Sequence, residues 1–390
     1  MEPILTREEI EQRERATLAP YAALAAESRG RRFPSRDHPL RTVFQRDRDR
    51  VVHAAAFRRL EYKTQVFIPH ERDHFRTRLT HTIEVAQIAR TLARSLRLNE
   101  DLAEAIALAH DLGHTPFGHS GEDVLKDLLA GFGGFNHNRQ TLRIVDLLEQ
   151  RYPEHPGLNL TYEVREGIVK HETVWDHKVA EFDDHAHPTL EAALVDVADE
   201  LAYNAHDIDD GLSAGMLAFD DLCRQPVWEV FGLDGRGAFE RLHEDQKRYA
   251  LVRRLIDLTA TDVIAHTAAQ IARFRIASLA DVRSAPEKLT GYSPDLRPAV
   301  TALKQFLFSD MYQRPRLLAL AKRARTILEG IFDRLMAEPE RLPARFREML
   351  QTEETEIVVT DYMAGMTDRY AEKVYRELTG KEPPDLPEML

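Results

Sequence analysis

Apolar residues recur at steps of three and four along most of this chain, and the alternation of polar and apolar residues typical of a β-strand is scarce. Steps of three and four match the 3.6-residue repeat of an α-helix. The clearest stripe lies in residues 79–98 and comprises His81, Val85, Ile88, Leu92 and Leu96. The pattern predicts an all-α fold and excludes the alternating strands and helices of a parallel-sheet protein.

We expect further helices at residues 46–62, 101–113, 116–131, 136–150, 160–172, 189–210, 249–275, 298–309, 314–337, 343–351 and 360–379. Residues 64–77 are expected to form a loop or a short hairpin, and GFGG at 131–134 is expected to form a turn. The 390 residues should divide into an N-terminal segment (1–40), a helical core (41–215) and a helical extension that packs on the core (216–390).

The composition excludes several classes of protein. Hydrophobic residues make up 43% of the chain, which is too many for extended disorder. The one cysteine, Cys223, excludes an intrachain disulfide and a cysteine-based zinc site, and we expect it to be buried. The acidic N-terminus is not typical of a signal peptide, and no apolar run approaches the ~20 residues of a membrane span. We therefore expect a soluble, cytoplasmic protein with no membrane partner.

Charge and histidine content indicate where the chemistry lies. A formal net charge of −12 argues against general nucleic-acid binding. Of the 17 histidines, 14 fall between His53 and His206. Histidine binds metals and transfers protons near neutral pH. This crowding predicts a site in the first half of the chain.

His110 and Asp111 end an apolar helix, where a carboxylate opposes the negative end of the helix dipole. Such a carboxylate needs a cation, and a bound metal ion is the simplest one. His81 begins the stripe of the preceding helix, so antiparallel packing of the two helices would bring His81 to His110. Histidine nitrogens and carboxylate oxygens together suit a divalent metal ion.

A third helix, predicted at 189–210, is rich in carboxylates. Asp199, Tyr203 and Asp207 follow one another at steps of four, which places them on one helix face. We take Asp199 as the leading candidate for a further metal ligand. Two neighbouring carboxylates are alternatives for that role, Asp196 and Glu200.

Residues 41–78 hold ten Lys or Arg and five acids, a net charge of +5 in a chain of −12. Arginine binds phosphate oxygens bidentately, so this segment is a candidate for contact with an anionic ligand. For three of its arginines, Arg46, Arg48 and Arg50, a solvated helix surface, a subunit contact or an effector site are open alternatives. Farther along, His119 and Glu122 have the spacing at which a helix pairs a base with an orienting carboxylate.

These motifs together resemble a known family. His81, His110-Asp111 and Asp199 are similar to the H…HD…D signature of the HD-domain metal phosphohydrolases. More narrowly, HDLGHTPFGHSGE with DELAYNAHD resembles the deoxyguanosine-triphosphate triphosphohydrolase family, as do RDRDRVVHAAAFRRLEYKTQVF, FRTRLTHTIEVAQIAR and TDYMAGMTDRYA. The likeness covers about residues 30–215 and 356–375, and residues 216–355 match only as helices.

The resemblance implies an HD-domain helical fold with a C-terminal helical extension. It implies hydrolysis of a deoxynucleoside triphosphate to deoxynucleoside and inorganic tripolyphosphate. It also implies one divalent metal ion, Mn²⁺ or Mg²⁺ before Co²⁺, Ni²⁺ or Fe²⁺. Its four implied ligands are His81, His110, Asp111 and Asp199. The implied catalytic residues are His119 and Glu122 for proton transfer, with His114 near the phosphates. The implied substrate contacts are Arg78 and His137 at the phosphates, Gln65 and Tyr203 at the sugar, and Asp207 near the 3′-hydroxyl.

The family also implies a homo-oligomer, and a nucleotide effector or single-stranded nucleic acid are further candidate partners. Two other functions stay open. One is another HD phosphohydrolase, a nucleotidase or a phosphodiesterase, and the other is a non-enzymatic nucleotide sensor or single-stranded nucleic-acid-binding protein. Glu61 departs from the basic effector contacts of an animal relative. Asp368 and Arg369 fit the family's C-terminal motif, with no role that the residues themselves assign.

Overall fold

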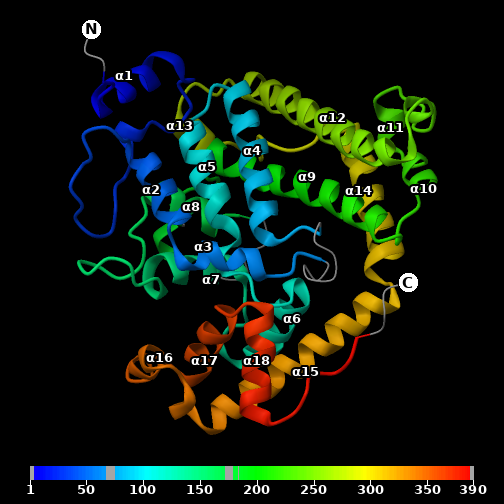
Figure 1. Ribbon diagram of the computed structural model, residues 1–390. Coiled ribbons are helices and arrows are strands. Elements are labelled where there is room, and N and C mark those ends of the chain that lie inside the picture. Colours follow the sequence, from blue (N-terminus) through cyan, green and yellow to red (C-terminus); the bar gives the residue numbers. More distant parts are fainter. Residues whose placement is uncertain (1–3, 67–74, 172–178, 183, 387–390) are drawn as a thin grey trace. The chain divides into compact units, whose positions relative to one another are not determined.

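The computed structural model describes residues 4–66, 75–171, 179–182 and 184–386. Across these residues the chain forms helices and no strand, apart from two isolated bridges, Arg31 to Thr161 and Thr64 to Thr77. The all-α prediction is therefore confirmed (Figure 1). The chain divides into two compact units: unit 1 comprises residues 1–54, 81–110 and 145–311, and unit 2 comprises residues 55–80, 111–144 and 312–390.

Unit 1 is built around two helices that are buried on most sides, α5 (Glu100–Ala109) and α9 (Leu190–Ser213). They pack against each other and against three further helices, α2 (Val43–Val52), α8 (Tyr162–Val169) and α12 (Glu244–Arg273). The unit also holds α1 (Arg7–Thr17), most of α4 (Arg78–Ser95), α10 (Phe219–Cys223), α11 (Val227–Val230), α13 (Leu279–Arg283) and α14 (Leu296–Leu307). Because both central helices are enclosed, polar side chains on them are held in defined positions.

The start of α5 follows from its sequence. The Asn99 side chain accepts hydrogen bonds from the backbone N–H groups of Asp101 and Leu102, which caps the helix. After Ala109 the chain continues as a 3₁₀ turn, His110–Gly113. The imidazole rings of His81 and His110 lie 5.8 Å apart, so the two helix ends meet as antiparallel packing predicts.

Unit 2 assembles three distant stretches of sequence around α15 (Pro315–Ala337), which packs against α6 (Gly118–Leu128), α17 (Thr355–Ala364) and α18 (Asp368–Thr379). Their buried apolar side chains form one cluster, which includes Val124, Leu125, Ile327, Ile331, Val358, Met363 and Val374. The remaining helices are α3 (Ala55–Arg59), α7 (His137–Arg143) and α16 (Ala344–Met349). This core supports both ends of the histidine-rich segment 114–137.

Two helices that were predicted to be continuous are interrupted in the structure. The helix expected at 46–62 is split into α2, α3 and a 3₁₀ turn at Leu60–Tyr62. The helix expected at 360–379 is two helices, α17 and α18, and EIVV at 356–359 lies inside α17. The turn predicted near residues 131–134 is confirmed, and Cys223 is buried. None of the helices in the described part of the chain combines the length and the apolar character that crossing a membrane requires.

Candidate functional site

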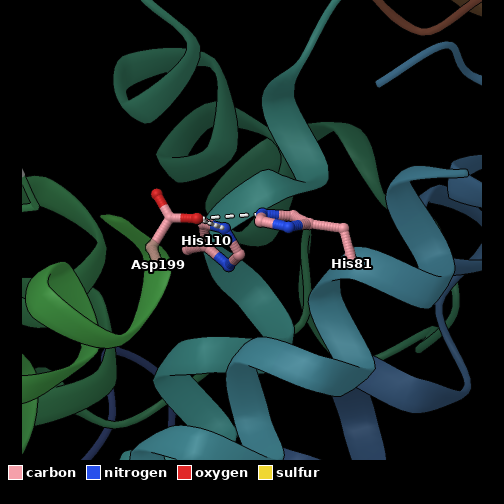
Figure 2. Close-up of side chains that lie close together, drawn as sticks. All are labelled: His81, His110 and Asp199. Atoms are coloured by element: carbon pink, nitrogen blue, oxygen red, sulfur yellow. Dashed lines mark hydrogen bonds and ion pairs between the residues drawn. The ribbon is translucent and has the colours of Figure 1, made fainter. Parts of the chain in front are cut away.

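Three side chains in unit 1 converge on one point: His81 from α4, His110 after α5 and Asp199 from α9. The Nε2 atom of His81 lies 2.9 Å from Oδ1 of Asp199, and Nε2 of His110 lies 3.6 Å from the same oxygen. Figure 2 shows both imidazoles directed at that carboxylate. The structure therefore brings together three of the four predicted metal ligands, and it selects Asp199 over Asp196 and Glu200 as their companion.

The three groups suit a divalent cation. One ligand atom from each lies within 4.8 Å of the other two, and two imidazole nitrogens with a carboxylate oxygen are typical ligands of a first-row metal ion. The Nδ1 atom of His110 lies 2.6 Å from the carbonyl oxygen of Ala107. Donation of the Nδ1 proton to that carbonyl leaves the lone pair on Nε2, facing Asp199. Burial alone would raise the pKa of Asp199, but His110, His171 and His81 hold it well below its usual range.

His171 joins this group, and the sequence analysis missed it. It lies just after α8, with Nδ1 2.8 Å from Oδ1 of Asp196 and Nε2 3.4 Å from Oδ2 of Asp199. Lys288 contacts the other Asp196 oxygen at 3.2 Å. Burial lowers the pKa of His171, but hydrogen bonds to Asp196 and Asp199 raise it well above its ordinary value. The only sequence signal was a histidine two residues beyond an apolar helix.

His81 has its own supporting contact. Its Nδ1 atom lies 3.1 Å from Nδ1 of His206, and Nε2 of His206 lies 2.7 Å from Glu84. His206 is buried on α9, seven residues after Asp199. Partners of this kind fix the ring orientation of a metal-ligating histidine.

A second group of polar side chains lies in unit 2. Arg78 and Asp111 are both buried, and Nη1 of Arg78 donates to Oδ2 of Asp111 over 3.1 Å. The other Asp111 oxygen lies 3.0 Å from Nε2 of His114. The cation that the sequence required beside Asp111 is therefore supplied at least in part by Arg78. The metal role of Asp111 stays a prediction.

Glu122 contacts His137, which the sequence analysis did not name as its partner; the pairing of Glu122 with His119 stays a prediction. Both Glu122 oxygens lie within 3.0 Å of His137 Nδ1, and the backbone N–H of His137 donates to Oε1 over 2.9 Å. The reason is that Asn136 caps α7 and presents the first turn of that helix to Glu122. Burial would raise the pKa of Glu122, but the charge and the hydrogen bond of His137 hold it well below its usual range.

The three histidines of unit 2 lie close together. The rings of His114 and His137 stack with centroids 4.0 Å apart, and the ring of His119 meets His114 edge-on at 5.7 Å. Burial, followed by the charge of Arg78, lowers the pKa of His114 well below its ordinary value. The His119 ring is accessible to solvent although many protein atoms surround it, and this crowding, with Arg78, also lowers its pKa. Neutral imidazoles are thus available at neutral pH.

The remaining predicted residues are placed as follows. Gln65 is buried in unit 2, and its Oε1 atom has no hydrogen-bond partner among the described residues. Tyr203 is half-buried and Asp207 is buried, one and two turns after Asp199 on α9. A buried acceptor without a partner costs free energy, which a bound ligand with a donor would recover.

In the motif HDLGHTPFGHSGE, close packing requires glycine at Gly113, and the backbone conformation favours glycine at Gly118. A Cβ atom at Gly113 would lie 2.1 Å from the carbonyl oxygen of His137 and 2.3 Å from the backbone nitrogen of Thr141. Gly118 has a φ of +61°, and a Cβ atom there would lie 3.1 Å from the carbonyl oxygen of Gln65. These glycines let the histidine segment approach α7 and the segment around Gln65.

Comparison with known proteins agrees with this geometry. Residues 78–204 match the model of the HD domain family, and residues 290–377 match a phosphohydrolase-associated domain. The fold and the paired histidine and aspartate groups therefore define an HD-domain phosphohydrolase.

Curated relatives narrow the assignment. A deoxyguanosinetriphosphate triphosphohydrolase-like protein of Ralstonia pickettii is 47% identical, covering 93% of this chain and 94% of its own. Proteins of the same description from Geobacter sulfurreducens and Azoarcus sp. are 45% and 48% identical, over 94% and 93% of this chain and 96% of each relative. The chain belongs to this deoxyguanosinetriphosphate triphosphohydrolase-like family. A solved hypothetical protein from Aquifex aeolicus, covering 77% of this chain and 79% of its own at 17% identity, has a TM-score of 0.30, too low to inform on the fold.

Proposed function

We propose that this chain is a metal-dependent triphosphohydrolase that converts a deoxynucleoside triphosphate and water to deoxynucleoside and inorganic tripolyphosphate. The observation that carries the proposal is the convergence of His81, His110 and Asp199 on one point. Two histidines of unit 2 with lowered pKa values, His114 and His119, supply proton-transfer groups for such a reaction, and Arg78 supplies a phosphate-binding group.

His81, His110 and Asp199, with Asp111, would hold one divalent ion, for which Mn²⁺ and Mg²⁺ are the leading candidates. Such an ion, when bound, polarises a phosphate oxygen and lowers the pKa of a coordinated water. In the balanced reaction, the water oxygen bonds to the α-phosphorus and the bond from that phosphorus to the 5′-oxygen breaks. The 5′-oxygen leaves as the hydroxyl of the deoxynucleoside, and tripolyphosphate keeps the oxygen of the water.

The proton transfers fall to the histidines of unit 2. His119 has a solvent-accessible ring with a lowered pKa, so it is neutral and able to accept a proton at neutral pH. Glu122 holds Nδ1 of His137, which leaves Nε2 of His137 as the atom that contacts substrate. Arg78 carries a fixed positive charge for the triphosphate, which offsets the overall negative charge of the chain.

Selection of the sugar is assigned to Gln65, Tyr203 and Asp207. The free Oε1 of Gln65 suits a sugar hydroxyl donor, and Asp207 would accept from the 3′-hydroxyl. Tyr203 would exclude a 2′-hydroxyl by crowding. On this proposal Tyr203→Ala raises the turnover of ribonucleotides relative to deoxyribonucleotides, and Tyr203→Phe, which keeps the ring, leaves the ratio unchanged. An unchanged ratio in Tyr203→Ala would place the discrimination elsewhere.

The test is a product assay. The protein is stripped with a chelator, Mn²⁺ or Mg²⁺ is added back, and each dNTP and NTP is supplied singly and in mixture. Ion-exchange chromatography should resolve deoxynucleoside and tripolyphosphate, and His110→Ala should abolish both. In H₂¹⁸O the label should appear in tripolyphosphate. Monophosphate products would indicate another phosphohydrolase, activity only in mixtures would indicate an effector, and no turnover with any metal would contradict the proposal.

A further inference from the structure

The start of the last helix has no part in the function proposed above, although it holds a buried carboxylate. α17 ends at Ala364, and α18 begins at Asp368. The Asp368 side chain belongs to unit 2 and is 6% exposed. Burying a carboxylate costs free energy unless it is hydrogen-bonded. The hydrogen-bond donors around Asp368 therefore show which segments it fixes.

Asp368 accepts hydrogen bonds from two segments that precede it by hundreds of residues. Its Oδ2 atom accepts from the backbone N–H of Thr64 over 2.9 Å and from the Thr64 hydroxyl over 2.5 Å. Its Oδ1 atom accepts from the backbone N–H of Phe117 over 2.9 Å. Thr64 directly precedes Gln65, and Phe117 lies two residues before His119. One carboxylate therefore joins the segments that carry two predicted site residues.

Lys63 makes a second link between the same segments. Its Nζ atom donates to the carbonyl oxygen of His114 and, over 2.9 Å, to that of Ala364 at the end of α17. Burial, together with the charges of Arg59 and Arg78, lowers the pKa of Lys63 to about 7. Lys63 and Asp368 thus each connect the C-terminal helices to the histidine segment through hydrogen bonds.

The turn that these links hold is strained. Phe117 has a φ of +65°, the left-handed region that side-chain-bearing residues rarely adopt, and Gly118 follows with +61°. Such a conformation persists only where its surroundings enforce it. The hydrogen bond from Phe117 N–H to Asp368 does so at the residue where the strain lies.

We propose that Asp368 is a positioning residue, which fixes the turn at Phe117 and the Thr64 backbone so that His119 and Gln65 are held in the geometry of the reaction. The proposal rests on the function proposed above for its kinetic consequences. Its structural part, the order of residues 114–121, is independent of that function.

The decisive variant is Asp368→Asn. An amide replaces one oxygen by a donor, which must face either the Phe117 N–H or the two Thr64 donors, so one link is lost at unchanged side-chain size. We expect kcat for dNTP hydrolysis to fall about 100-fold, as for a catalytic group displaced by about 1 Å. Hydrogen–deuterium exchange should increase in a peptide covering residues 114–121 and stay unchanged in α15.

Thr367→Ala is the matched control. Thr367 caps α18 through the backbone N–H of Tyr370 and makes no hydrogen bond to Thr64 or Phe117 in the described part of the chain. It should lower the melting temperature but leave kcat within about twofold of wild type. If kcat falls in proportion to the loss of melting temperature in both Asp368→Asn and Thr367→Ala, Asp368 has only a structural role.

Thr64→Val and Thr64→Ser decide the case if Asp368→Asn does not fold. Valine removes the hydroxyl donor to Asp368, and we expect a loss in kcat of about tenfold, whereas serine keeps the donor and should keep the activity. Equal activity of the valine and serine variants, with unchanged exchange in 114–121, would overturn the proposal. If the wild-type protein hydrolyses no dNTP, the proposed function fails, and the exchange measurements alone still decide the role of Asp368.

Discussion

His171 contacts two carboxylates at once, and these contacts indicate a role beside the proposed metal site. It lies between Asp199, a predicted ligand, and Asp196, which Lys288 anchors. A hydrogen bond from an outer residue orients a ligating carboxylate and is worth about 10- to 100-fold in metal affinity. If Asp199 binds a metal ion as proposed, His171 would act on that ion through Asp199.

Replacing His171 by phenylalanine keeps a ring of similar size and removes both nitrogens. We expect the Kd for Mn²⁺, measured by isothermal titration calorimetry, to rise about 10- to 100-fold. His155→Phe is the control, because His155 stacks on the Phe33 ring away from the cluster and should leave the affinity unchanged. Equal affinities in wild type and His171→Phe would remove His171 from the metal centre.

Glu14 provides a test of pH dependence outside the site. It is buried in unit 1, where its Oε2 atom accepts from the backbone N–H of Ala25 over 2.8 Å. Burial raises the pKa of Glu14 from 4.5 to about 7. Between these values the folded state binds the proton more tightly than the unfolded state, so the contribution of Glu14 to stability falls as pH rises.

Glu14→Gln lacks this fall, so its stability relative to wild type should improve from pH 4.5 to pH 7, by at most about 3 kcal/mol. The measurement is urea unfolding of both proteins at pH 5 and pH 8. A difference in unfolding free energy that is the same at both pH values would show that Glu14 has the same pKa folded and unfolded.

The residues of the site could be predicted from the sequence pattern only where they lie on, or at the end of, a helix with a regular apolar repeat. His81, His110 and Asp199 each lie on or at the end of a strongly periodic helix, and the structure brings them together. His171 lies beyond the end of a helix, where no period applies. The contact of Glu122 with His137 was missed because His137, fifteen residues away, reaches Glu122 through the packing of two helices.

At the level of the elements, helix boundaries were predicted accurately where the sequence carries a strong start or stop signal. The helix expected at 314–337 is α15, Pro315–Ala337. The proline in its first turn marks where it begins, and its long apolar stripe indicates how far it extends. The break after Val52 carries no such signal, because neither glycine nor proline stands at residues 53–54. We attribute the break after Val52 to tertiary packing. The break before α18 could be recognised from Thr367, which caps that helix.

The contact between the 3₁₀ turn His110–Gly113 and α7 yields a test at the same scale. Gly113→Ala places a methyl group against backbone atoms of His137 and Thr141, which cannot move as a side chain could. We expect a loss in unfolding free energy of about 1–3 kcal/mol or more, and a disturbed His137 signal by NMR. Gly131→Ala is the control, because nothing lies within 4 Å of a Cβ atom there. Two variants of equal stability would contradict the packing described.

For the molecule as a whole, the division into two units determines how a metal ion should stabilise it. All three clustered ligands, His81, His110 and Asp199, belong to unit 1. Chains of more than one unit commonly unfold in more than one step. A cation held by these three side chains in the folded chain would therefore stabilise unit 1 directly, whatever Asp111 adds.

We expect Mn²⁺ at 100 times its Kd to raise the unfolding free energy of unit 1 by about 2.7 kcal/mol. Calorimetry with and without the ion should show the shift in wild type and lose it in His110→Ala. Chelation should reverse it. A metal-induced shift of the same size in His110→Ala would place the bound ion elsewhere.

The hydrogen bonds from Thr64 to Asp368 join residues 304 positions apart. A ribosome adds about 5–20 residues per second, so the nascent chain carries Thr64 for about 15 s to a minute before Asp368 is made. Until Asp368 is made, the chain lacks the carboxylate that accepts from the Phe117 N–H in the folded structure. On the role proposed for Asp368, a chain released short of residue 368 would carry His119 without the carboxylate that holds the turn preceding it.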